Sequence, residues 1–299
     1  MSSVRNSVVV PAAIGNVTPA RGDRSIGAIL IDEGRLKPES AEAILRLQRE
    51  QGLRFGDAAI QLGLLTQEDI DFAISRQFDY PYLLRGHSGV SEKLVAAYAP
   101  FTPQVEALRA LRGQLMLRWF DADASHKALA IVSAERKEGR SFIAANLAIV
   151  FSQLGEHTLL VDADMRNPRM HQLFGLDNRA GLSALLTGRG GPETIQRIPA
   201  LRDLSVLPAG VQPPNPSELL ARPEFAQLLK GEWAKEYDAL IIDTPAVSNA
   251  ADARAVAACT GGAMIVVRKN SSRIGRVRDL AENAAQTGVT VVGTVLNDY

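Results

Sequence analysis

Residues 128–141 read ALAIVSAERKEGRS, an apolar run followed by a charged turn with a single glycine. The apolar part, 128–133, is short and continuous, as in strands that a parallel sheet buries on both faces. The sequence from about Ser141 to Leu154 then has the composition of a helix. A buried strand, a turn and a helix in this order predict an α/β unit.

Apolar runs and helical stretches keep alternating along the chain. A helix from Val105 to about Trp119 comes before the run at 128–133. We expect further strands at 158–163, 204–207, 239–243, 263–268 and 289–296. This alternation predicts a doubly wound α/β domain with a mostly parallel sheet.

The turn after the first strand lies where a Walker A phosphate loop would be. In such a loop, backbone N–H groups and a helix N-terminus hold phosphate, a lysine neutralises it, and a serine or threonine holds Mg²⁺. Gly139 and Ser141 fit the pattern, but Ala134 stands at the first glycine and Arg140 at the lysine. Taken alone, the turn fits an ordinary strand-to-helix connection as well as a phosphate site.

Carboxylates follow two of the other expected strands. Asp162 and Asp164 come at the end of one strand, and Asp243 ends another, as in a Walker B motif. Ligands of open α/β sheets bind at the carboxyl ends of the strands. These acids could instead cap helices, but together with the phosphate loop they favour a Mg²⁺–nucleotide site in an α/β domain of the P-loop NTPase type.

The composition limits other classes of function. The chain has 299 residues, 46% of them apolar, enough for about two domains with separate cores. Lys plus Arg and Asp plus Glu both number 33, so no chain-wide positive field exists to bind nucleic acid or anionic lipid. With one cysteine, Cys259, no signal peptide and no apolar run of about 18 residues, we expect a cytoplasmic protein that reaches a membrane through a partner.

We expect the chain to divide into four segments. They are a mobile tail at 1–23, a small all-α domain at 24–78, a linker rich in turn residues at 79–103, and the α/β domain at 104–299. The all-α domain repeats itself at a constant offset, so that Gly34 matches Gly63 and Leu36 matches Leu65. Its apolar spacing of three and four positions predicts paired amphipathic helices.

A series of further motifs runs through the α/β domain. It comprises Leu160–Pro168, Leu173–Leu176, Leu207–Gly210 and Pro213–Leu220. These motifs resemble those of the bacterial tyrosine kinases of polysaccharide export, and within that family they are most similar to the chain-length-determinant kinases. The resemblance covers nearly all of residues 103–297. It implies phosphoryl transfer from ATP to tyrosine with Mg²⁺, and action beside a transmembrane polysaccharide co-polymerase at the inner membrane.

The resemblance also implies roles for single residues. Asp164 would be the base toward a tyrosine hydroxyl, and Asp162 and Arg140 would complete the catalytic group. The metal would be held by Ser141, Asp162 and Asp243. The nucleotide would contact Glu138, Gly139, Arg140, Ser141, Phe142, Arg166 and Asn297.

Three charged residues upstream resemble the motif with which the family assembles into rings. They are Glu106, Arg109 and Arg112, spaced by three so that they share one face of a helix. The resemblance implies a homo-oligomer that joins subunits through this face. The alternative is a charged face that contacts only solvent.

The chain departs from the family at two places. Arg136 and Lys137 replace the usual Pro-Gly of the phosphate loop, and Tyr299 stands alone where the family commonly has a tyrosine cluster. These departures leave open a rival function, a nucleotide-gated pseudokinase scaffold of the same export machinery. A simple ATPase is a third, weaker possibility.

The second repeat of the all-α domain resembles the cyclic di-GMP motif of the N-terminal domains of type II secretion ATPases. In the first half Ser25 stands where that motif has arginine, with Arg24 one position earlier. The resemblance implies contacts from Arg24, Ile26, Gly27, Gln48, Arg54, Phe55, Gly56 and Gln77. The alternative is a helical docking domain that keeps the repeat for packing alone.

Overall fold

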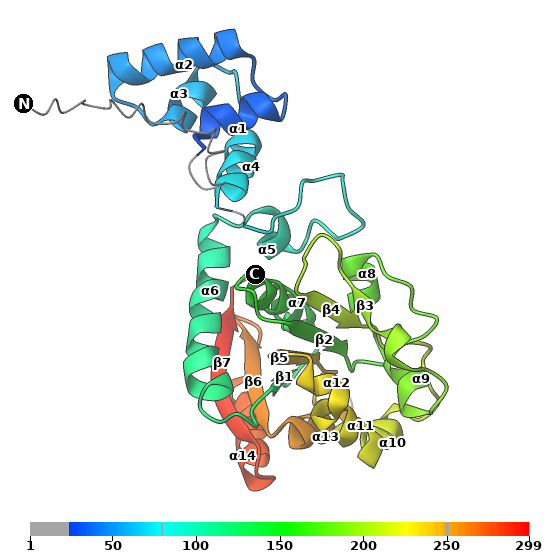
Figure 1. Ribbon diagram of the computed structural model, residues 1–299. Coiled ribbons are helices and arrows are strands. Elements are labelled where there is room, and N and C mark those ends of the chain that lie inside the picture. Colours follow the sequence, from blue (N-terminus) through cyan, green and yellow to red (C-terminus); the bar gives the residue numbers. More distant parts are fainter. Residues whose placement is uncertain (1–23, 79, 249–250, 299) are drawn as a thin grey trace, which may run out of the picture. The chain divides into compact units, whose positions relative to one another are not determined.

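The computed structural model describes residues 24–78, 80–248 and 251–298. The chain divides into two compact units, Met1–Tyr80 and Pro81–Tyr299 (Figure 1). The tail predicted at 1–23 lies outside the described residues. Each unit has its own core.

The N-terminal unit is built from two helix pairs. They are α1 (Ile26–Asp32) with α2 (Pro38–Gln51), and α3 (Phe55–Gln61) with α4 (Gln67–Gln77). The starts of α3 and α4 follow those of α1 and α2 at the same offset that separates Gly34 from Gly63. These two glycines, at equivalent places, both adopt a positive φ, of 70° and 65°. α1 packs on α4 and α2 on α3, so each repeat buries its apolar face against the other.

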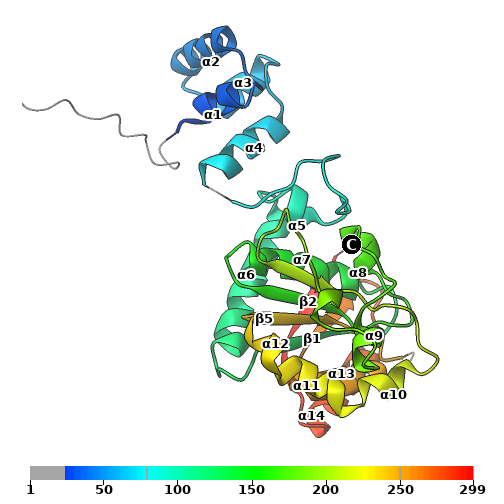
Figure 2. The ribbon, with the colours of Figure 1, turned by 45° about the vertical axis from the view of Figure 1, so that its right-hand side comes forward.

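The second unit contains one seven-stranded sheet with the order β3-β4-β2-β5-β1-β6-β7. Figure 2 shows three of its neighbouring strands, β2, β5 and β1, side by side. The strands are β1 (Ala128–Val132), β2 (Thr158–Asp162), β3 (Gln196–Arg197), β4 (Leu204–Leu207), β5 (Ala239–Asp243), β6 (Gly262–Arg268) and β7 (Thr290–Asn297). All neighbours are parallel except β3 and β4. The predicted mostly parallel α/β fold is therefore confirmed. The sequence analysis missed only β3, which has two residues and no apolar run.

Helices cover both faces of this sheet. One face carries α5 (Val95–Tyr98), α6 (Pro103–Leu115), α7 (Arg140–Ser152) and α8 (Met170–Phe174). The other carries α9 (Leu182–Leu186), α10 (Pro216–Leu220), α11 (Pro223–Lys230), α12 (Glu232–Lys235), α13 (Asp252–Thr260) and α14 (Ile274–Gln286). Successive strand residues alternate between the faces, as Leu129 and Ala130 of β1 do. This double covering explains the continuous apolar strands.

The helix expected from Val105 to about Trp119 is regular only to Leu115. Pro103 occupies its first turn, and a π-helical turn, Met116–Phe120, follows α6. The wider turn buries Trp119, whose indole Nε1 donates a 3.0 Å hydrogen bond to the Ala128 carbonyl at the start of β1. A tertiary contact has therefore set the form of this helix end.

The segment expected to be a linker packs on the α/β unit from Pro81 onward. The Ala96 amide donates a 2.9 Å hydrogen bond to Asn146 Oδ1 on α7. Gln153 Nε2 donates to the carbonyls of both Pro81 and Ala96. The segment therefore belongs to the α/β unit and is not free connecting chain, because its buried alanines cover α7. The segment contains one helical turn, α5 (Val95–Tyr98).

No helix within the described residues combines the length and apolar character needed to cross a bilayer.

We predict that Gly262→Ala destabilises the α/β unit. A Cβ there would lie 2.3 Å from Cζ2 of the buried Trp119. Such overpacking typically costs about 1–3 kcal/mol. Urea unfolding followed by circular dichroism checks this, with Gly293→Ala on the neighbouring strand β7 as control, since a Cβ there meets nothing within 4 Å. Equal unfolding midpoints for the two variants would contradict the prediction.

Candidate functional site

The phosphate-loop turn connects the carboxyl end of β1 to the N-terminus of α7. Gly139 has φ 98°, and a Cβ there would lie 2.1 Å from Asn297 Nδ2. That amide donates a 3.1 Å hydrogen bond to the Glu138 carbonyl. Asn297 at the end of β7 therefore packs directly on the loop, and glycine is required at position 139. Both residues were predicted at the nucleotide site from the sequence, and the structure brings them together.

Lys137 has a backbone conformation that lysine rarely adopts. Its φ is 64°, in the left-handed region that favours glycine. Its side chain is exposed, and its carbonyl accepts a 3.3 Å hydrogen bond from Arg268 Nη1. The loop thus keeps a glycine-type turn although the glycine has been replaced, at a typical cost of about 1–2 kcal/mol.

Arg140 does not extend toward solvent. The residue is only 8% exposed, and its guanidinium donates to three oxygens of the protein. Nε donates to the Thr244 carbonyl at 2.8 Å, and Nη1 donates to the Glu135 carbonyl at 2.9 Å and to Ser133 Oγ. The arginine at the lysine position therefore ties the loop to the ends of β1 and β5.

Glu138 is also turned inward. The residue is 1% exposed, and its carboxylate accepts a 2.8 Å hydrogen bond from the Glu135 amide and another from the Ser272 hydroxyl. These bonds brace the loop against the connection between β6 and α14. Phe142, expected to contact nucleotide, lies in the first turn of α7 and is half-buried against the core.

Asp162 and Asp243 lie side by side at the ends of β2 and β5, where they are register partners. Asp162 accepts hydrogen bonds from the amides of Asp164, Arg169 and Met170, at 3.2, 2.9 and 2.9 Å. Burial, and then the charge of Asp243, raise the pKa of Asp162 well above its usual range. Its oxygens hold the turn after β2 in place, a structural duty that the sequence did not reveal.

Asp243 differs from Asp162 because its carboxylate accepts no such hydrogen bonds from the residues that the structure describes. It is fully buried, and neither carboxylate oxygen has a hydrogen-bond partner in the described part of the chain. Burial raises the pKa of Asp243 to about 7, against the opposing charge of Arg140. The Ser141 hydroxyl also stabilises the charged form of Asp243 and so lowers its pKa, although the two groups do not meet the geometry of a hydrogen bond. A buried acceptor pair without a donor is rare and marks a place for a ligand.

A hard divalent cation fits this place. Unpartnered carboxylate oxygens and a serine hydroxyl are ligands that Mg²⁺ prefers. Among the described residues, no group of three or more acidic, histidine or cysteine side chains is placed to hold a metal. Mg²⁺ would therefore share its coordination with water and phosphate, as is usual for this ion. Ser141 and Asp243 fit that role. The oxygens of Asp162 already accept three backbone hydrogen bonds, and its part in holding the metal stays a prediction.

The turn after β2 presents Asp164 and diverts Arg166. Asp164 is 6% exposed, and its Oδ1 accepts a 2.9 Å hydrogen bond from the Asn167 amide. Arg166 Nε pairs with the buried Asp252 at 2.8 Å, and its Nη2 donates to Ser217 Oγ at 3.0 Å. Arg166 thus links this turn to α13 and α10, and its predicted contact with nucleotide would need that pair to open.

The charged face of α6 is partly engaged within its own chain. Arg109 pairs with Glu106 one turn earlier. Arg112 Nη1 donates a 2.5 Å hydrogen bond to the Val150 carbonyl on α7. Of the three residues expected in ring assembly, Arg112 therefore braces the α/β unit itself.

The residues expected to contact cyclic di-GMP include several with packing roles. A Cβ on Gly27 would lie 3.1 Å from the Phe55 ring, and one on Gly56 would lie 3.2 Å from Ile70. Arg24 pairs with Asp32 at 3.0 Å, while Arg54 is exposed. Ile26, Gln48 and Gln77 are half-buried. The glycines let the helix pairs approach closely, which any ligand-free docking domain would also need.

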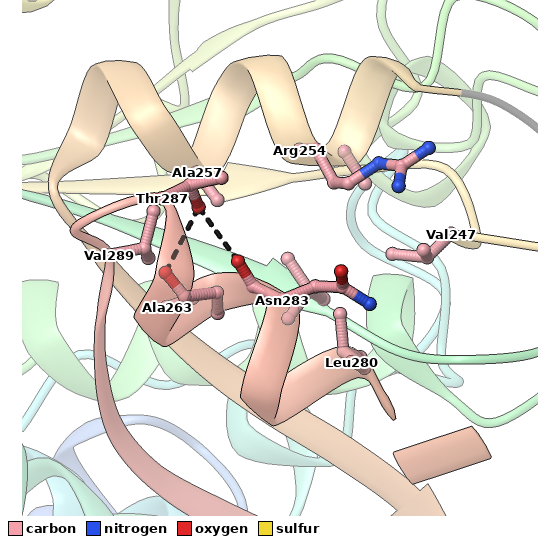
Figure 3. A pocket seen from close by; sticks show the side chains of 11 residues that line it. Val247, Arg254, Ala257, Ala263, Leu280, Asn283, Thr287 and Val289 are labelled. Carbon is pink, nitrogen blue, oxygen red and sulfur yellow. Dashed lines mark hydrogen bonds between the residues drawn. The ribbon is translucent and has the colours of Figure 1, made fainter. Parts of the chain in front are cut away.

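A small cavity lies between α13, α14 and the sheet (Figure 3). Its lining is mainly apolar, with Leu280 and Val289 among the labelled residues. Thr287 Oγ1 beside it is satisfied by the carbonyls of Asn283 and Ala284, each at 3.0 Å. The cavity contains neither a residue predicted for the site nor an acidic side chain among its described lining residues, and it is not the candidate site.

No model of a protein family matches the chain. CapB of Staphylococcus aureus, which its name assigns to the tyrosine-protein kinases, is 34% identical over 195 residues, or 64% of this chain and 83% of that protein. EpsB of Ralstonia solanacearum, named in the same way, is 35% identical over 204 residues, which cover 68% of this chain but only 27% of EpsB. The solved kinase domain of Escherichia coli tyrosine kinase ETK superposes with a TM-score of 0.66 at 33% identity, over 71% of this chain and 82% of that domain.

We predict that the α/β unit becomes less stable as the pH rises from about 4 to about 7. Asp243 has a pKa of about 7 when folded and 3.8 ordinarily, so the folded chain holds the proton more tightly across this range. The stabilisation by the protonated Asp243 is complete below the ordinary pKa of 3.8 and is lost above the folded-state pKa of about 7. Asp243→Asn should therefore flatten the profile, although Asp162, shifted in the same direction, leaves a residual slope.

Urea unfolding without Mg²⁺, followed by tryptophan fluorescence at pH 5.5 and pH 8, measures this profile. Trp119 and Trp233 both belong to the α/β unit. Asp279→Asn, an exposed site on α14, is the matched control. A profile of Asp243→Asn as steep as that of the wild type would show that this carboxyl is not the titrating group.

Proposed function

The chain belongs to the bacterial tyrosine-protein kinases, and from this membership we propose that it transfers the γ-phosphoryl group of ATP to tyrosine hydroxyls in a system for exopolysaccharide export. The observation that carries the proposal is the unpartnered, buried carboxylate of Asp243 beside the phosphate loop and level with Asp162. This is where a Mg²⁺–nucleotide would need oxygen ligands. A structural carboxylate would be hydrogen-bonded.

The roles of the residues follow from their positions. Backbone amides of the loop and the N-terminus of α7 would bind the phosphates. Ser141 and Asp243 would hold Mg²⁺, which when bound supplies charge neutralisation for the transferred group. Asp164, on the turn braced by Asp162, would accept the proton of the tyrosine hydroxyl. Phosphoryl transfer needs mainly positioning and charge neutralisation, so these few groups suffice.

The setting of this activity is proposed from the resemblance. The chain spans 27% of EpsB, so the activity and partners of that whole protein are not carried over. We propose a chain-length-determinant kinase of the EpsG type, cytoplasmic and peripheral at the inner membrane, whose anchor is a transmembrane polysaccharide co-polymerase. A homo-oligomer would form through the face of α6 that carries Glu106 and Arg109. Arg112 would contribute by holding α6 on α7.

The rival function is a nucleotide-gated scaffold without transferase activity. Two observations favour it: Arg140 is bound to three oxygens of its own chain, and Lys137 occupies a glycine conformation. The first leaves the loop without the usual phosphate-facing lysine, and the second places a bulky side chain where the loop usually has glycine. A scaffold would bind ATP and assemble with its partner but would transfer nothing.

Asp164→Asn decides between kinase and scaffold. With ATP and Mg²⁺, and with the transmembrane partner co-expressed, we expect the wild type to place phosphate on tyrosine of itself or the partner. The variant should lose at least about 100-fold in rate, the usual contribution of a general base. Mass spectrometry of phosphotyrosine at matched abundance measures both.

Asp203→Asn is the control, because Asp203 precedes β4 at the opposite end of the sheet. Its phosphotyrosine should equal that of the wild type. ATP binding without phosphotyrosine in any of the three proteins would rule out the kinase and leave the scaffold.

For the N-terminal unit we propose cyclic di-GMP as ligand. The sequence repeat is also present in the structure, because the second helix pair begins at the same offset from the first throughout. This structural repeat supports the proposal. Arg54 is exposed at the N-cap of α3, where a guanidinium could pair with a guanine edge or a phosphate. Such a ligand would couple the kinase to a second messenger.

We expect Arg54→Ala to weaken cyclic di-GMP binding by about tenfold or more, since a hydrogen bond to a charged group contributes about 1.5–3 kcal/mol. Isothermal titration of the full chain measures the affinity. Arg46→Ala on α2, whose side chain is 79% exposed, is the control. Absence of binding to the wild type would leave a docking domain as the function of this unit.

A further inference from the structure

Two arginines of the phosphate loop have opposite surroundings. Arg140, at the position of the usual lysine, is buried, whereas Arg136, at the position of the usual proline, is exposed. Only one of them is free to approach a phosphate without first breaking a set of internal hydrogen bonds. The difference bears on which cation serves the nucleotide.

Arg140 is held from three directions. Its acceptors belong to the end of β1 (Ser133), to the loop (Glu135) and to the segment after β5 (Thr244). Rotating the guanidinium outward would remove the Arg140 donor from the buried Thr244 carbonyl, whereas the Glu135 carbonyl would keep its hydrogen bond from the Ser133 hydroxyl. A buried acceptor left unsatisfied costs about 1–3 kcal/mol. The structure therefore assigns Arg140 to the framework of the loop.

Arg136 lies at the mouth of the site. Its Nη2 donates a 2.9 Å hydrogen bond to Asn167 Oδ1, and the amide of the same Asn167 donates to Asp164 Oδ1, also at 2.9 Å. Arg136 therefore reaches from the phosphate loop to the turn that carries Asp164. A guanidinium there has donors left for the oxygens of a terminal phosphate, which it can bind with two parallel hydrogen bonds.

We propose that Arg136 is the cation that binds the terminal phosphate of the nucleotide, in place of the residue at position 140. The inference rests on the proposed function, because it requires ATP at the loop. Lys137 is the other exposed cation of the loop, but the hydrogen bond to Asn167 places Arg136, not Lys137, against the Asp164 turn. Arginine at 136 would thus compensate for the buried arginine at 140.

Titration of the full chain with ATP, with ADP and with adenosine, in the presence of Mg²⁺, tests this. Arg136→Ala should weaken ATP about tenfold or more, as expected for a lost hydrogen bond to a charged group. The affinity for ADP should fall less, and the affinity for adenosine should not change. A variant that merely distorts the loop would weaken all three ligands together.

Three further variants are compared with Arg136→Ala. They are Arg140→Lys, Lys137→Ala and Arg202→Ala. Arg140→Lys keeps the charge but loses donors, so it should lower the melting temperature of the ligand-free chain. Lys137→Ala should change ATP affinity by less than about threefold, a difference under about 0.7 kcal/mol. Arg202, exposed before β4 at the far end of the sheet, is the control and should change neither property.

The outcomes are separable. ATP binding by the wild type with equal affinity for Arg136→Ala overturns the inference while leaving the proposed function intact. A selective loss of ATP affinity in Lys137→Ala also overturns the inference. The same loss in Arg140→Lys overturns it too, if the melting temperature of that variant is unchanged. Failure of the wild type to bind ATP defeats the proposed function, and the assignment of Arg136 with it.

Discussion

The buried carboxylate of Asp243 is the constraint around which the α/β unit is arranged. It ends β5, the central strand of the seven, next to the equally buried Asp162. Two adjacent carboxylates in a low-dielectric interior repel each other and resist ionisation. The fold relieves one of them with three backbone amides and leaves the other unpaired. That asymmetry turns the edge of the sheet into a place where a cation is favoured.

The phosphate loop is shaped by residues far away in the chain. Glu138 is held by Ser272 after β6, and Asn297 at the end of β7 packs on Gly139. The loop therefore depends on the two strands that lie beyond β1 in the sheet. This bracing explains how the loop tolerates a lysine with a positive φ at position 137, because the tertiary contacts over-determine its conformation.

The repeat of the N-terminal unit came directly from the sequence, since helix starts, glycine turns and apolar spacing all recur at one offset. The sheet was equally predictable, because short continuous apolar runs that alternate with helical stretches are typical of parallel strands buried on both faces. Asp162, Asp164 and Asp243 were found by their place at strand ends. β3, with two residues and no apolar run, gave no signal, and the π-helical turn after α6 depends on the contact between Trp119 and β1.

The amino-acid order thus determined the α/β class, the helix repeat, the family resemblance and the position of the candidate site, because each rests on local spacing. It did not determine which side chains face a ligand. Arg140 and Arg136 are both cations of one loop in the sequence, and only their distant partners, Thr244 for one and Asn167 for the other, separate a framework residue from an exposed one. The bond from Arg136 joins residues 31 positions apart, and the bond from Arg140 joins residues 104 positions apart. Hydrogen bonds over such separations cannot be predicted from local spacing.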